Sequence, residues 1–240
     1  MLAVAVALQL VLSTSVLPDI CKLNNGMTDD VRKAFLNEHN HRRSEVARGL
    51  ANDKAGGFAP KAAKMWKMNY DCKIEESIME WVSKCNYAHS QKEGYGESIW
   101  ASSDNHMDLK KAAESSSSMW FAELEERGVG KELKLTEQLF NRRVGHYTQM
   151  VWQDTTKIGC AVKWCDKITF AACQYQTPGN IMTYNIYEKG EPCSKCDCEK
   201  CQCRDGDDVK STVGAEKKPV GEGGQQSSPM EPETGSTTPS

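Results

Sequence analysis

The 240-residue sequence predicts an α+β fold in which helices pack on the faces of a mainly antiparallel sheet. Three segments early in the chain carry apolar residues at helical spacing, and two later stretches have the small and apolar residues of strands. Helices therefore precede strands, without the regular alternation that builds a parallel sheet. The eleven cysteines add an expectation of disulfide crosslinks.

The N-terminus predicts a secretory signal peptide at 1–17. This segment has no charged side chain, and its apolar run is too short to cross a bilayer. Pro18 and Cys21 follow at once, which disfavours a buried N-terminal helix. An exported chain meets an oxidising compartment in which cysteines pair. We therefore expect a secreted, extracellular protein with no transmembrane segment and one cysteine left over after pairing.

Thr28–Val46 is the first expected helix. Thr28 can cap it, and Asp29 and Asp30 suit the positive N-terminal end of the helix dipole. The residues expected on its packed face are Val31, Phe35, His39, Arg42 and Val46. A loop rich in glycine, asparagine and proline follows at 48–60.

Two further helices bring ionisable side chains to packed faces. Asp71–His89 is the second helix, and His89 continues its apolar stripe at the helix end, four residues after Cys85. Met107–Arg127 is the third helix, and its expected inner face consists of Ala112, Ser116, Met119 and Trp120. Glu123 lies at helical spacing from the last two and so points inward, unlike the glutamates beside it.

The strands and a crosslinked segment follow. A short extended piece is expected at 97–102, and Tyr147–Cys160 passes from GHYTQMVW into a strand at KIGCAV. Thr169–Tyr175 is another strand, and PGNIM makes a turn after it. Residues 191–203 are too short and polar for their own core, so their five cysteines must hold them. Residues 204–240 have no aromatic side chain and are expected to be disordered.

Charge and motifs exclude several classes of function. The net charge is −3 and arises entirely within 204–240, so no basic patch and no nucleic-acid partner are expected. The zinc-protease pattern HExxH and the serine-hydrolase pattern GxSxG are both missing from the sequence. We therefore assign no catalytic residues.

Four motifs resemble signatures of the CAP superfamily, which comprises cysteine-rich secretory proteins, antigen 5 and pathogenesis-related 1 proteins. GHYTQMVWQDT (145–155) resembles the first signature, and CQYQTPGNI (173–181) resembles the second with Thr177 in place of a proline. HNHRR (39–43) is similar to the family's HNxxR, and GESI (96–99) to its GENI. With EKGEPCSKC and KAAKM, the chain most resembles the activation-associated (Ancylostoma-type) secreted proteins of nematodes.

The resemblance implies a three-layer α-β-α sandwich with a central cleft over 18–190, then a hinge-like segment at 191–203. It implies that two histidines and two glutamates line the cleft, namely His89, Glu97, Glu123 and His146. Neutral imidazoles bind divalent metals, so the expected metal ligands are His89 and His146, with Zn²⁺ as the first choice. The alternative is a satisfied polar network that only positions the cleft loops.

The family pattern also implies two disulfides, Cys160–Cys173 and Cys85–Cys165. A third pairing, Cys21–Cys72, is added as a hypothesis that no motif supports. The cysteines at 193–203 include two CxxC pairs, a spacing that also suits zinc, but in an exported chain disulfides are the better interpretation.

Two classes of function follow from the resemblance. The favoured one is a secreted, non-enzymatic parasite protein that modulates host immunity by binding a host cell-surface protein or a lipid or sterol. The alternative is a hydrolase with a zinc-bound water in the same cleft, for which we identify no third protein ligand and no nucleophile. A weaker third interpretation is a structural component tethered through the odd cysteine. The oligomeric state does not follow from the sequence.

Overall fold

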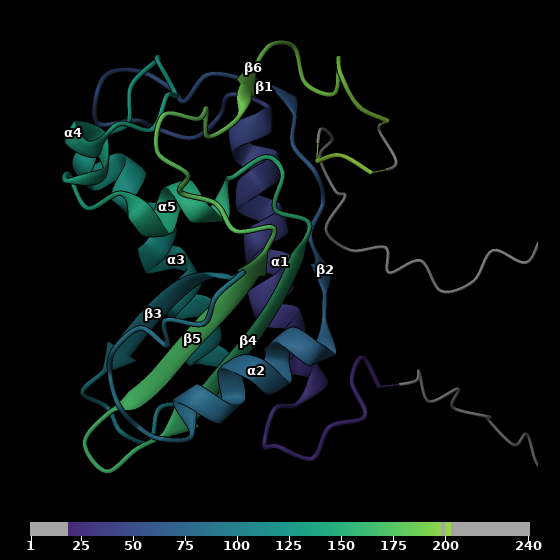
Figure 1. Cartoon of the computed structure of the whole chain (residues 1–240), viewed down its shortest axis with the longest axis vertical. Coiled ribbons are helices and arrows are strands. Elements are labelled where there is room, and N and C mark those ends of the chain that lie inside the picture. The colour runs from purple at the N-terminus through teal and green to yellow at the C-terminus, as the bar shows by residue number, and fades with distance from the viewer. Residues whose placement is uncertain (1–18, 198–199, 203–240) are drawn as a thin grey trace, which may run out of the picture. The chain divides into compact units, whose positions relative to one another are not determined.

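A mixed sheet lies between helices on its two faces (Figure 1). The computed structural model describes residues 19–197 and 200–202, all within one compact unit. Helix α2 (Cys72–Val82) packs on one face, and α1 (Asp29–Ala47) and α3 (Leu109–Arg127) lie on the other. The predicted α+β class and three-layer α-β-α arrangement are confirmed.

Some of the predicted segments lie outside the described residues. These are the signal peptide at 1–17, the tail at 204–240, and Cys198 and Cys203 of the cysteine-rich segment. Within the part of the chain that the structure describes, no helix combines the length and the apolar character needed to cross a membrane.

The main sheet is mostly antiparallel, with the strand order β2-β4-β5-β3. Strand β4 (Lys157–Trp164) and strand β3 (Gly96–Ser102) both pair antiparallel with β5 (Thr169–Gln176). The short β2 (Asn69–Tyr70) runs parallel to β4. Strand β5 is buried along almost its whole length, because helices cover both faces of the sheet, and this explains its run of small and apolar residues.

Short elements lie beyond the main sheet. Strand β1 (Ala62–Lys64) pairs with β6 (Glu188–Lys189) in a two-stranded sheet. Helices α4 (Glu137–Phe140) and α5 (Gly145–Met150) precede β4. The stretch GHYTQM therefore folds as a helix, and buried Glu123 accepts hydrogen bonds from backbone N–H groups of its first turn.

The second helix is shorter than the sequence predicted, which corrects the expected position of His89. Helix α2 ends at Val82 and not at His89. Cys85 has a left-handed backbone (φ 53°) and forms a disulfide with Cys165, so the chain leaves the helical path there. Trp81 then donates its indole N–H to the carbonyl of Ala88 in the following loop. His89 accordingly lies on a loop with 45% of its side chain exposed.

Two residues that the sequence placed on packed faces are not buried. Arg42 keeps 27% of its side chain exposed, whereas the adjacent Arg43 is completely buried. Met119 is 59% exposed, and its sulfur accepts a hydrogen bond from Trp100 on the edge strand β3. Helix α1 is covered over more than one stripe, so a single row at helical spacing did not identify all of its buried positions.

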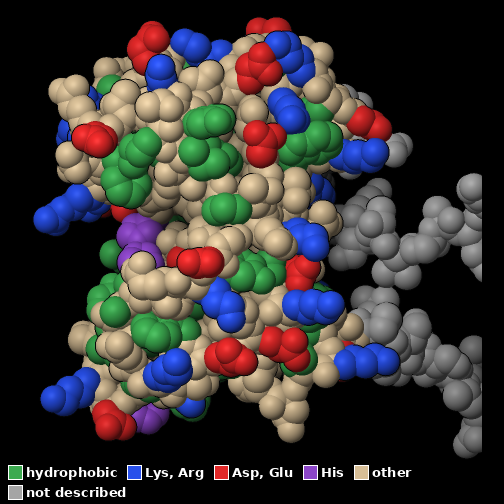
Figure 2. Space-filling view, in the orientation of Figure 1, with side chains coloured by type: hydrophobic (Ala, Val, Ile, Leu, Met, Phe, Trp, Pro, Cys, Tyr) green, Lys and Arg blue, Asp and Glu red, His purple; other side chains and the backbone are tan. Residues whose placement is uncertain are grey.

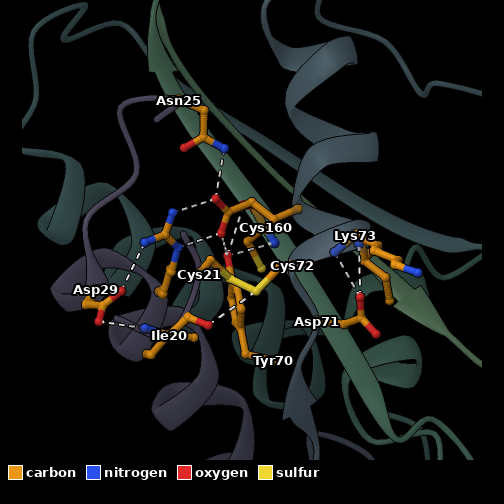
Figure 3. The surroundings of a disulfide bond; sticks show 12 residues. Ile20, Cys21, Asn25, Asp29, Tyr70, Asp71, Cys72, Lys73 and Cys160 are labelled. Carbon is orange, nitrogen blue, oxygen red and sulfur yellow. Dashed lines mark hydrogen bonds and ion pairs between the residues drawn. A yellow bond between two sulfur atoms is a disulfide. The ribbon is translucent and has the colours of Figure 1, made fainter. Parts of the chain in front are cut away.

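Disulfides join segments that lie far apart in the sequence. Cys160 and Cys173 are bonded and face each other in the register of β4 and β5. Cys21 is bonded to Cys72 at the first residue of α2 (Figure 3), which holds the N-terminal segment against that helix. Cys85–Cys165 joins the segment after α2 to the end of β4, so two of the three bonds involve the region of α2.

A buried ion pair joins α1 to α2, and Figure 3 labels Asn25 and Tyr70, whose side chains donate to its carboxylate. Arg32 of α1 donates from Nε and Nη2 to the two carboxylate oxygens of Glu75 in α2, at 2.7 and 2.8 Å. The Tyr70 hydroxyl and the Asn25 amide also donate to this carboxylate, at 2.7 and 2.8 Å. The charge of Glu75 is therefore satisfied even though the residue has no exposed surface.

Arg43 makes the most extensive set of long-range hydrogen bonds from any side chain among residues 19–197. Its guanidinium donates to main-chain carbonyls of two separate segments, which belong to Trp66, Met150, Trp152, Gln153 and Thr155. No ion pair to Arg43 is present in the described residues. Burial lowers the pKa of Arg43 to about 9, so the side chain stays protonated at neutral pH.

His39 is completely buried and electrically neutral in the folded protein. Its Nδ1 donates to the carbonyl of Phe35 at 2.8 Å, and its Nε2 accepts from the Tyr175 hydroxyl at 2.9 Å. The pKa of His39 is lowered from 6.5 to about 4. Burial is the main cause and the nearby charge of Arg43 adds to it, whereas the hydrogen bond to Phe35 acts in the opposite direction. The prediction that His39 lies on the packed face of the first helix is confirmed.

Replacing Arg43 with alanine should destabilise the fold far more than replacing Arg42. Removal of the Arg43 guanidinium leaves buried carbonyls without donors, so we expect a loss of at least about 3 kcal/mol. Arg42→Ala removes partly exposed ion pairs to Glu38 and Glu45 and a cation–π contact with the Phe121 ring, each of which contributes about 0.5 kcal/mol. Denaturant unfolding with the disulfides intact measures both values. Equal losses for the two variants would contradict the structural role of Arg43.

Protonation of His39 should weaken the fold in mildly acidic solution. The folded pKa lies below the unfolded one, so the stabilisation is complete above about pH 6.5 and is lost as the pH falls toward 4. Over that interval, the wild type should lose about 3 kcal/mol more than His39→Gln in denaturant unfolding. His106→Gln is the matched control at an exposed histidine and should follow the wild type. Parallel stability curves for the wild type and His39→Gln would contradict the expectation.

Candidate functional site

A cavity of about 610 Å³ contains all four residues that the sequence analysis assigned to a cleft. Its lining consists of His89, Glu97, Glu123, Arg127, Phe140, Asn141, Arg143, Gly145, His146 and Asn180. Histidine side chains gather in a notch at the margin of the face drawn in Figure 2. The lining is mainly polar and charged, in contrast to the apolar core beneath it.

One side of the cavity is formed by Glu123 of α3 and His146 of α5. The Glu123 Oε1 atom accepts from Nδ1 of His146 at 2.8 Å. Its Oε2 atom accepts from the backbone N–H groups of His146 and Tyr147, each at 3.0 Å. The Trp120 ring stacks on the His146 imidazole, with centroids 6.0 Å apart. One buried carboxylate thus fixes both the start of α5 and the orientation of its histidine.

A second histidine–carboxylate pair lies on the sheet side of the cavity. Glu97, on β3, accepts through Oε1 from Nδ1 of His89 at 2.8 Å and from the Ser90 N–H at 2.9 Å. Its Oε2 atom accepts from the Ser90 hydroxyl and from the Gln174 amide. Desolvation favours the protonated acid, but the hydrogen bonds from His89, Ser90 and Gln174 outweigh it and lower the pKa of Glu97.

The two pairs fix the same tautomer on both imidazole rings. Because a carboxylate accepts from each Nδ1, the proton of the neutral ring lies on Nδ1 and the lone pair on Nε2. In the described chain, neither His89 nor His146 has a hydrogen bond at Nε2. Carboxylate, imidazole and an open Nε2 form the arrangement that orients histidine ligands in zinc sites.

The donor set therefore suits a divalent cation, with an incomplete protein shell. Among described residues, no three donors that include His89 or His146 have ligand atoms within 4.8 Å of one another. Water or atoms of a ligand would complete the coordination. The one donor group of three found at this spacing in the described chain is Cys193, Cys196 and Cys201. These cysteines are disulfide-bonded and so do not offer the thiolates that zinc requires.

Gln149 explains why the motifs of this sequence meet at the cavity. Its side chain accepts from the Gly179 N–H at 2.9 Å and donates to the Thr155 hydroxyl at 3.2 Å. It also packs against Gly96, where a Cβ atom would lie 2.0 Å from the Gln149 amide oxygen. The glycine before Glu97 is thus required by the close approach of Gln149, which brings the segments of three motifs together.

Sequence reasoning did not identify two arginines in the cavity lining. Arg127 donates to Glu123 Oε1 at 3.4 Å and to the main-chain carbonyl of Arg143. Glu123 and Arg127 are four residues apart in one predicted helix, and this spacing favours an ion pair between them. Arg143 lies between α4 and α5, and no sequence pattern pointed to it.

Comparisons with known proteins agree on one family. Residues 36–175 match the model of the cysteine-rich secretory protein family, CAP. Ancylostoma secreted protein of Ancylostoma caninum is 51% identical over 182 residues, which cover 73% of this chain and 43% of that protein. The chain therefore spans less than half the length of this relative.

Two further relatives have a more similar length. Hookworm platelet inhibitor 1 of Ancylostoma caninum is 30% identical over 179 residues, which cover 74% of this chain and 78% of that protein. The crystal structure of NaASP2 with Zn²⁺ has a TM-score of 0.73 and 54% identity, covering 76% of this chain and 99% of that chain.

Loss of either carboxylate should release only its own histidine. Glu123→Ala should shift the neutral ring of His146 from the Nδ1–H tautomer toward the Nε2–H form, and leave His89 unchanged. Glu97→Ala should do the reverse. Long-range ¹H–¹⁵N correlation spectra of the histidine rings at neutral pH distinguish the two forms. If both rings keep the Nδ1–H tautomer in both variants, the carboxylates do not set it.

Proposed function

The chain belongs to the cysteine-rich secretory protein (CAP) family, and we propose that it is a secreted, non-enzymatic binding protein whose histidine–glutamate cavity holds a divalent cation. One observation carries the proposal. Both cavity histidines are held at Nδ1 by a carboxylate, and both have Nε2 free for a ligand. Zinc is the expected ion because imidazole nitrogen suits it, and the related NaASP2 is described with Zn²⁺.

Each residue of the cavity has a distinct role in this proposal. His89 and His146 supply the two protein ligands, and Glu97 and Glu123 orient their rings. A bound cation supplies positive charge and coordination positions that water or a ligand fills. Most side chains that line the cavity are polar or charged, which suits a charged ligand better than a lipid tail.

Secretion and a host target complete the proposal. The uncharged segment 1–17 and the disulfides of the core support export to an oxidising compartment. One relative is named as a platelet inhibitor, which supports a cell-surface protein of a host as the target class for this chain as well. A zinc-dependent hydrolase is less well supported, because no third protein ligand joins His89 and His146 in the described chain.

Zinc binding should require both cavity histidines. In calorimetry at neutral pH, the wild type should bind one zinc ion, and His89→Ala/His146→Ala should show no binding at that site, since both imidazole ligands are gone. Binding by the wild type should weaken in acidic solution, because only neutral imidazoles can ligate the ion.

The matched control is His106→Ala, which removes an exposed histidine outside the cavity. It should retain wild-type zinc affinity, and circular dichroism should show that all three proteins are folded. Unchanged zinc affinity in the double variant would place the ion elsewhere and overturn the proposed site.

A further inference from the structure

We propose that Arg143 and the cation in this cavity together form a binding site for a carboxylate ligand. The inference rests on the proposed cation site and adds the chemical class of ligand that the site takes. It depends on the fixed position of Arg143, on donors without partners at the cavity rim, and on the charge balance of the cavity.

The backbone of Arg143 is tied to the His146 side of the cavity. Its carbonyl accepts from Arg127, whose guanidinium also pairs with Glu123, the residue that holds the His146 ring. Its N–H donates to the carbonyl of Phe140 at 2.9 Å, and its φ of 61° turns the chain between α4 and α5. Arg143 is thus anchored at its main chain while its side chain lines the cavity.

Donor groups at this rim have no partner in the described part of the chain. The Arg143 guanidinium forms no hydrogen bond or ion pair there, and neither does the side-chain amide of Asn141. Both residues are exposed and both line the cavity. Arg127, in contrast, already has an acidic partner in Glu123. The rim therefore presents side-chain donors that no described residue occupies.

The formal charges of the lining balance only while the cavity lacks a cation. Two carboxylates, Glu97 and Glu123, stand against two guanidiniums, Arg127 and Arg143, and ligating imidazoles are neutral. A divalent ion therefore leaves two positive charges without compensation. Since charges interact more strongly in a partly enclosed site than in bulk water, an anion is favoured there.

A carboxylate matches this combination of groups. It can make a two-point contact with a guanidinium, and its oxygen is also a zinc ligand. Such a group comes either from a small free acid or from an acidic side chain of a protein. Phe140 at the rim keeps 38% of its surface exposed and offers an apolar contact to a protein segment that a small acid cannot use.

Cobalt-loaded protein tests the inference by spectroscopy. Co²⁺ replaces the colourless ion, and its visible absorption reports when an anion enters the coordination shell. Acetate and a capped glycine–glutamate–glycine tripeptide are titrated at constant ionic strength into the wild type, Arg143→Gln and Arg143→Lys. Arg142→Gln is the matched control, since it removes the adjacent exposed arginine, which does not line the cavity.

The wild type and Arg142→Gln should bind acetate with equal affinity. Arg143→Gln should bind it about tenfold more weakly, with unchanged Co²⁺ affinity, and Arg143→Lys should recover part of the loss. Tighter binding of the tripeptide than of acetate would identify an acidic side chain of a protein as the natural carboxylate. Equal binding of the two probes would identify a small free acid. Equal acetate affinities for the wild type and Arg143→Gln would overturn the inference alone. A wild type that does not bind Co²⁺ would overturn the proposed cation site and, with it, the inference.

Discussion

A single buried guanidinium holds the end of α5, a helix whose first turn lines the cavity, to two other segments of the chain. Arg43 binds carbonyls at the end of α5 and in the chain that leads to β4, and a further carbonyl before β2. Most of these main-chain carbonyls lie outside regular helices and strands, and a buried carbonyl without a donor is costly. The cation serves as a common donor for them and so fixes the end of the helix whose first turn carries His146.

The two histidine–carboxylate pairs of the cavity are built by different means. Glu123 and His146 belong to two helices that pack together, whereas Glu97 is part of the sheet and His89 lies on a loop. The Cys85–Cys165 disulfide anchors the start of that loop. Ser90 and Gln174 donate hydrogen bonds to the carboxylate of Glu97. The same local chemistry thus arises twice, from covalent anchoring of a loop and from helix packing.

The layers of the fold were predictable, because apolar spacing and short motifs are local signals. Strand β5 and helices α1 and α3 begin and end within two residues of their expected bounds. The path of His89 was not predictable, since it depends on a disulfide to a residue far away in the sequence. Spacing wrongly favoured Arg42 over buried Arg43, because their environments differ only after distant loops pack against α1. Of the cavity residues, His146 and Glu97 lie in the quoted motifs and Glu123 was placed by helical spacing, whereas Arg143 acquires its place through the fold alone.

The dual role of Glu123 limits how this side of the cavity can evolve or be copied. One oxygen accepts a hydrogen bond from an imidazole, and the other accepts from two free backbone N–H groups in the first turn of a six-residue helix. A shorter acid would fail to reach both, and an amide would present a donor where two acceptors are needed. Selection on ligand binding and selection on folding therefore act on the same carboxylate and cannot be relaxed separately. A designer who transfers the Glu123–His146 pair to another scaffold must also transfer the first turn of α5, because the histidine has no fixed orientation without that turn.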